Sequence, residues 1–335
     1  MAETPEELQR QLFDRIKSQL PANIALPNEL ASLLDVSVDS AYRRISGKTL
    51  LNLSELRDVC KKFGLSLDQL FQLGEESYLF RGRAMDYQNF EFKGFLQNST
   101  EYLKLLNSAP DKILYYTNRD IPIFYHFGYP SLCLFKHHFW MRSIFQSPDY
   151  MTNRFKLSDT NEELLTIGKA LFTEYAKLPG VEIWNIDCIN STLMQIEYYR
   201  ETKIFASEKD VEAVYNDVEK MLDHIEKQAA MAVKLSVEGK VLNGNAHYQM
   251  FKNEFLLGDN TLYGKAGTME SAFVNHNVLN YISTSDPRFC EYTLNTMKNL
   301  ISRSTLISGV SEKERSKFFY ELRLRLDNSR NKVIS

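Results

Sequence analysis

The chain has 335 residues and a formal net charge of −3, with 44% hydrophobic and 25% charged residues. This is the composition of an ordinary globular protein with two or three domains. No apolar run reaches about 18 residues, and the N-terminus lacks a signal-peptide pattern, so we expect a cytoplasmic protein without a membrane span. The four cysteines, at positions 60, 133, 188 and 290, form no CxxC pair, which argues against a zinc site or redox motif.

Five short helices are predicted in the first 74 residues. The first has an apolar residue at every fourth position from Leu8 to Leu20 and ends at Pro21. Serines precede three of the helices as N-caps, and glycines follow three of them as C-caps. The predicted helices span residues 6–20, 27–34, 38–46, 55–63 and 67–73, with N-caps Ser37, Ser54 and Ser66 and terminal glycines Gly47, Gly64 and Gly74.

The second and third predicted helices meet the requirements of a helix-turn-helix, in which the second helix of the pair enters the major groove of DNA. Small or apolar residues fall where the two helices cross, and the other side of helix 38–46 is polar. The crossing positions are Leu30, Ala31, Leu34, Val36, Ala41 and Ile45. The sequence therefore predicts an N-terminal DNA-binding domain. A bundle that binds a protein partner, as an interaction scaffold, is the alternative.

Helix 38–46 carries most of the residues that we expect to contact DNA. Arg43 is predicted to reach a guanine, and Asp39 to accept from a cytosine amine or to orient Arg43. Arg44 and Lys48 are predicted to bind phosphates. The candidate DNA-binding residues are Ser37, Val38, Asp39, Ser40, Tyr42, Arg43, Arg44, Lys48 and Thr49.

The predicted DNA-binding domain is not basic overall. Residues 1–76 contain 9 Lys+Arg and 12 Asp+Glu, whereas residues 40–54 contain three basic residues and no acidic one. DNA affinity would therefore depend on a few phosphate contacts and on dimerisation.

The stretch from residue 8 to residue 73 resembles the lambda-repressor/Cro-like (XRE-type) helix-turn-helix. The resemblance lies in Leu30-Ala31 before the turn, Val36-Ser37 at it, Gly47-Lys48 after the reading helix, and GLSLDQL from Gly64. It is most similar to long regulators of Bacteroidetes-type bacteria that carry this reader ahead of a large C-terminal domain. The family usually has glycine where this chain has Asp35 and an apolar residue where it has Arg44. Which of Arg43 and Arg44 faces the bases is therefore left open.

The rest of the chain predicts a fold that is mainly α with a smaller α+β part. Residues 75–86 are predicted to be a linker and residues 87–335 a C-terminal domain. Residues 115–127 are either a strand or an irregular entry to a helix. The predicted helices span 88–108, 130–147, 161–177, 187–203, 208–239, 287–304 and 311–326, and the predicted strands 247–257, 261–265 and 270–275.

Three features of the C-terminal part have two interpretations each. In helix 208–239 apolar residues recur at alternating spacings of four and three residues. This pattern is typical of a coiled-coil dimer interface and equally of a helix packed in the core of its own domain. The dense aromatic residues from Tyr115 to Tyr129 either line a ligand pocket or, as we favour, form core. His137 and His138 point about 100° apart on a helix, so one buried and one exposed histidine is favoured over a metal site.

The sequence thus predicts a bacterial transcriptional regulator that binds double-stranded DNA through helix 38–46 as a homodimer. The C-terminal domain is expected to dimerise and to sense an effector, either a small molecule or a protein. No catalytic, phosphate-binding or metal motif occurs, so we expect neither enzymatic activity nor a cofactor.

Overall fold

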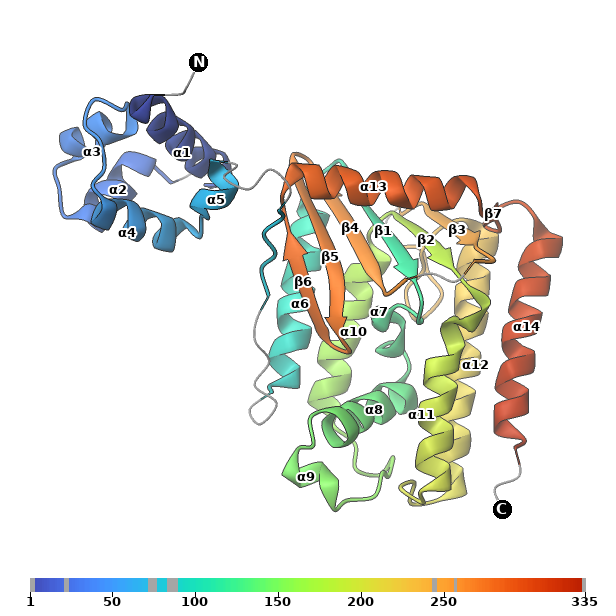
Figure 1. Cartoon of the computed structure of the whole chain (residues 1–335). Helices are drawn as coiled ribbons and strands as arrows, with labels where there is room; N and C mark the ends of the chain where they lie inside the picture. The colour runs from blue at the N-terminus through green and yellow to red at the C-terminus, as the bar shows by residue number, and fades with distance from the viewer. Residues whose placement is uncertain are drawn as a thin grey trace. The chain divides into compact units, whose positions relative to one another are not determined.

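The computed structural model describes residues 4–20, 24–71, 77–82, 90–242, 246–255 and 258–332. The chain divides into two compact units, Met1–Leu79 and Phe80–Ser335 (Figure 1). This division falls within residues 75–86, the predicted linker, of which only residues 77–82 are described. The fold is mainly α with a smaller α+β part, as the sequence predicts.

The N-terminal unit is a bundle of short helices (Figure 1). Thr4 begins the first helix with a capping box, and the Ser37 side chain caps the third helix as predicted. The prediction that Ser54 is an N-cap is wrong. The fourth helix begins at Leu53, and its N-cap is Asn52, whose side chain accepts hydrogen bonds from the amides of Ser54 and Glu55. Pro21 and Gly74 lie outside the described residues. The helices are α1 (Pro5–Gln19), α2 (Leu26–Leu34), α3 (Val38–Ile45), α4 (Leu53–Phe63) and α5 (Leu67–Leu70).

One hydrophobic cluster holds this bundle together. Leu12, Phe13 and Ile16 come from one face of α1, at helical spacing. Ala41 and Val59 are fully buried, so α3 and α4 each direct one face at the same centre. The predicted crossing residues Leu30 and Ala31 belong to the cluster, with Leu34, Val36 and Ile45 packed against it.

The C-terminal unit is built on one mixed sheet. Three central strands, β1, β2 and β3, are parallel, whereas β4 continues antiparallel from β1. The order across the sheet is β6-β5-β4-β1-β2-β3-β7. The strands are β1 (Lys112–Asn118), β2 (Gly180–Trp184), β3 (Tyr248–Lys252), β4 (Thr261–Ala266), β5 (Met269–Asn277), β6 (Asn280–Thr284) and β7 (Thr305–Leu306).

Helices cover both faces of the sheet. Figure 1 shows α13 along one face, where Cys290 and Met297 pack on Ile183 and Tyr263, and most other helices on the opposite face. The helices are α6 (Phe92–Ser108), α7 (Ile123–His126), α8 (Pro130–Phe139) with a π turn (Trp140–Ile144), α9 (Pro148–Met151), α10 (Glu162–Ala176), α11 (Asn190–Glu201) after a 3₁₀ turn (Ile186–Ile189), α12 (Glu208–Met231), α13 (Pro287–Ser302) and α14 (Glu312–Arg330). Within the described residues, none of these helices is long and apolar enough to cross a membrane.

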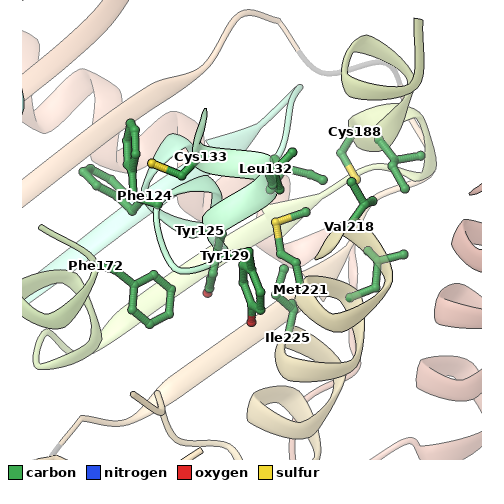
Figure 2. Packing of buried hydrophobic residues seen from close by; sticks show 14 of the residues in the cluster. Phe124, Tyr125, Tyr129, Leu132, Cys133, Phe172, Cys188, Val218, Met221 and Ile225 are labelled. Carbon is green, nitrogen blue, oxygen red and sulfur yellow. The ribbon is translucent and has the colours of Figure 1, made fainter. Parts of the chain in front are cut away.

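The seam of helix 208–239 is core and not a dimer interface. The helix ends at Met231, because Ala232 adopts the left-handed conformation at φ 53°. Its seam residues from Val211 to Ala229 are buried inside the C-terminal unit, where α12 packs between α8 and α14. Figure 2 shows Tyr129, at the start of α8, in one cluster with Met221 and Ile225 of α12.

A buried carboxylate stands at the centre of the sheet. Glu182 of β2 is fully buried and accepts hydrogen bonds from Tyr248 (2.8 Å), the Trp184 indole (2.8 Å), Tyr125 (3.2 Å) and Tyr175. Lys234, which follows α12 and is also buried, places its Nζ 3.6 Å from the same carboxylate. Because a buried charge is tolerated only when it is paired and hydrogen-bonded, this cluster fixes β2 against β3, α7 and α10.

Replacement of Glu182 by leucine should therefore destabilise the C-terminal unit. The variant leaves the Lys234 ammonium buried without a counter-charge, which costs about 3–5 kcal/mol. Tyr248→Phe removes one of four hydrogen bonds and should cost about 1 kcal/mol. Urea unfolding followed by tryptophan fluorescence measures this, since Trp140 and Trp184 both lie in this unit. A Glu182→Leu midpoint equal to that of the wild type would contradict this account.

Candidate nucleic-acid interface

Helix α3 presents a mixed polar and aromatic face to solvent. Val38 is 43% exposed and Tyr42 57% exposed, and Asp39 and Arg43 are exposed as well. Ala41, on the opposite face, is fully buried. The helix therefore divides as the sequence predicts, with one side in the core and one side able to contact a ligand along its length.

Arg43 and Arg44 have different environments. The guanidinium of Arg44 donates to the Ser40 hydroxyl (2.8 Å) and to the Glu55 carboxylate (2.7 Å), and its side chain is only 13% exposed. Arg43 is exposed, and its side chain makes no ion pair with another described residue. Arg44 thus joins α3 to the start of α4 and is not placed as a free phosphate ligand, whereas Arg43 is on the open face.

A glutamine of α1 fixes the C-terminal end of α3. The buried Gln9 amide donates to the carbonyl oxygens of Arg44 (2.7 Å) and Thr49 (2.8 Å). Its Oε1 accepts from the amide of Leu51 (2.7 Å). One side chain therefore holds both the last turn of α3 and the loop to α4. The sequence does not reveal the role of Gln9, because its hydrogen-bond partners lie 35 to 42 residues away along the chain.

Two backbone positions set the direction of the chain on either side of α3. Asp35 ends α2 at φ 52°, a left-handed conformation that aspartate tolerates better than most residues, and its amide bonds back to Ala31. Gly47 has φ 78°, and a Cβ there would lie 3.0 Å from the carbonyl oxygen of Glu6. The close approach of α1 thus requires glycine after α3, which accounts for Gly47 more fully than a helix stop does.

The predicted residues separate into two groups. Ser37, Ser40 and Arg44 make hydrogen bonds inside the unit, since Ser37 caps the amide of Ser40 and Ser40 accepts from Arg44. The others have exposed side chains in the described structure: Val38, Asp39, Tyr42, Arg43, Lys48 and Thr49. The second group lies in the stretch formed by α3 and the loop after it.

Two exposed leucines that the sequence does not predict follow this group along the chain. Leu53, at the start of α4, is 85% exposed, and Leu50 is exposed in the loop before it. Together with Val38 and Tyr42 they add apolar surface, which in a DNA reader can contact the thymine methyl group. Neither leucine belongs to a periodic apolar pattern in the sequence, so no pattern marks either one as exposed.

The other candidates from the sequence lie in the C-terminal unit. Among the described residues, no group of three or more His, Cys, Asp or Glu is placed to hold a metal ion. The expectation of one exposed histidine is wrong: His138 is buried against Tyr199 (3.0 Å) and His137 is half-buried against Phe92. Burial lowers the pKa of both histidines to about 4, so both are neutral at pH 7.

Comparison with known proteins supports the N-terminal assignment. Residues 9–83 match the BetR domain, a family of helix-turn-helix-like DNA-binding domains. The match covers less than a quarter of the chain and points to DNA-binding regulation. No curated protein and no solved structure shows significant similarity to this chain.

Removal of the Gln9 amide should loosen the end of α3. In Gln9→Ala the Leu51 amide loses its acceptor and two carbonyls lose their donor, so we expect exchange of the Leu51 amide to accelerate roughly tenfold or more. Hydrogen–deuterium exchange of the full chain measures this. Asp14→Ala, at an exposed position of the same helix, is the control. Equal protection of Leu51 in all three proteins would show that Gln9 does not hold the loop.

The Arg44–Glu55 pair should make the stability of the N-terminal unit depend on pH. The hydrogen bond from Arg44 lowers the pKa of Glu55 below its usual 4.5. A carboxyl whose pKa is lowered on folding stabilises the fold above the unfolded pKa, and this contribution disappears as the pH falls through the folded pKa.

Wild type should therefore be more stable than Glu55→Gln at pH 7, by a margin that shrinks below pH 4.5. Circular dichroism during urea unfolding follows the unfolding of both units. Tryptophan fluorescence identifies the unfolding transition of the C-terminal unit, so the other transition belongs to the N-terminal unit. A margin that does not change with pH would rule out the ion pair as its source.

Proposed function

We propose that this protein is a sequence-specific DNA-binding transcriptional regulator that reads the major groove with α3, in the manner of lambda-repressor-like proteins. The observation that carries the proposal is the exposed face of α3, held rigid at its C-terminal end by Gln9 and Arg44. A reading element has to be preorganised, since loose side chains lose binding energy to ordering. The BetR-domain match over residues 9–83 supports the same conclusion.

In this proposal the exposed residues have distinct roles. Arg43 contacts a guanine through two hydrogen bonds, and Asp39, one turn earlier, orients it or accepts from a cytosine. Val38 and Tyr42 contact thymine methyl groups or the sugar edge. Lys48 and Thr49 bind phosphates and fix the register without reading sequence. Arg44 acts from inside, as the link between α3 and α4.

Dimeric binding follows from the low charge of the unit. With 9 basic and 12 acidic residues in positions 1–76, one copy makes few phosphate contacts. Two copies on a two-fold operator double those contacts and bring both reading helices to successive grooves. The interface of this dimer is not the seam of α12, which is buried within one chain.

A second candidate function, binding of a protein partner by the N-terminal unit, is favoured by one observation. Leu50 exposes an apolar side chain in the loop after α3, and Leu53 does so at the start of α4. Protein interfaces contain such apolar positions at their centres. The two functions differ in salt dependence, since DNA binding weakens steeply as salt displaces phosphate contacts and binding to an apolar patch does not.

The roles of Arg43 and Lys48 can be tested by selection of genomic DNA fragments with the purified full-length protein. Arg43→Ala should weaken binding to the selected motif by about 10- to 100-fold, because a bidentate guanine contact contributes about 1–3 kcal/mol. Lys48→Ala should weaken binding to all sequences equally and lower the slope of affinity against salt by about one.

Lys61→Ala, at an exposed position near the end of α4, is the matched control and should leave both properties unchanged. Enrichment of a two-fold motif supports dimeric reading. Equal losses of Arg43→Ala and Lys48→Ala on motif and random DNA would overturn the role assignment, and salt-independent binding would favour the protein-partner function.

A further inference from the structure

A large cavity lies inside the C-terminal unit, on the face of the sheet that α6 covers. Its volume is about 880 Å³, within the range of roughly 300–1,000 Å³ that small-molecule sites occupy. Among the described residues, the lining includes Leu103, Leu114, Tyr116, Leu262, Phe273 and Tyr281.

One cross-strand row of the sheet forms part of the floor of the cavity. Tyr116 of β1 pairs with Leu262 of β4, which pairs with Phe273 of β5 and then with Ser283 of β6. Paired residues in neighbouring strands point to the same face, so these side chains lie next to one another. Arg81, which bridges to Ser283, ends the row at the edge of the sheet. The site is thus built on rigid strands.

The lining defines the chemistry of its ligand. Arg81 and Glu91 are the charged residues among those described in the lining, and both are exposed, at the rim. Deeper in, the lining is aliphatic and aromatic, so a charged group there would be buried without a partner. The hydroxyls of Tyr116 and Tyr281 lie 3.2 Å apart and share one hydrogen bond. This pair offers a polar contact in the interior.

We propose that this cavity binds an uncharged, mainly apolar small molecule that carries a hydrogen-bonding group for the Tyr116–Tyr281 pair. The ligand fills the space between α6 and the outer strands and is held mostly by apolar contact. Burial keeps both tyrosines protonated at neutral pH, because it raises the pKa of each. The proposal concerns the C-terminal unit alone and does not depend on DNA reading, so the two can fail separately.

The test uses the full-length protein and the uncharged fluorescent probe N-phenyl-1-naphthylamine. We expect saturable binding of one probe per chain at micromolar concentration. Ser99→Trp places a large side chain at a half-buried position of the lining and should weaken binding at least tenfold. Gln97→Trp, at an exposed position of the same helix outside the lining, should bind as the wild type does.

Competition tests the charge and the polar contact. 1-Naphthol, uncharged with one hydroxyl, should displace the probe, whereas 1-naphthalenesulfonate at the same concentration should not. Tyr281→Phe, a small change that keeps the fold, should weaken displacement by 1-naphthol several-fold without abolishing probe binding. Absence of saturable binding, equal binding by Ser99→Trp and Gln97→Trp, or stronger competition by the sulfonate would each overturn the proposal.

Discussion

The buried carboxylate of Glu182 is the interaction on which the C-terminal unit depends. Its hydrogen-bond donors come from α7, α10, β2 and β3, and its counter-ion Lys234 follows α12, so one charge sets the distance of three helices from the sheet. Gln228 of α12 extends the network by donating to the Tyr125 hydroxyl (3.0 Å). Such a network admits one arrangement, because every donor that moves away leaves the charge less compensated.

The N-terminal unit uses the same principle on a smaller scale. Its helices are short and its apolar cluster is small, so buried polar side chains specify how they meet. The side-chain amide of Gln9 both donates to and accepts from the backbone around α3. One carboxylate oxygen of Glu55 accepts from Arg44, and the other accepts from the backbone amide of Asn52. Helix α3 is therefore held by side chains that do not lie on its exposed face. The residues that hold α3 in position are thus different from those exposed on its surface.

This division explains how much the sequence could predict. The buried face of α3 follows from Ala41 and Ile45 at helical spacing, and the candidate reading residues follow as its complement. Gln9 could not be found, since it is one of many polar residues on α1 and has no local partner to indicate its role. The choice between Arg43 and Arg44 depends on Glu55, eleven residues on, and the seam of α12 is ambiguous because a domain core and a dimer require the same periodicity. Strand β2 is short and buried on both faces, so it shows no alternation to detect.

The row of side chains that begins at Glu182 also connects the core to the cavity. Tyr116 is the neighbour of Glu182 on β1, and from there the row runs through Leu262, Phe273 and Ser283 to Arg81. At one end the row is fixed by a buried charge, and at the other it lines a space that side chains do not fill. Arg81 lies two residues after the end of the N-terminal unit and pairs with β6 through its backbone. The segment that follows the N-terminal unit is thus anchored at the edge of the sheet, where Arg81 lines the rim of the cavity.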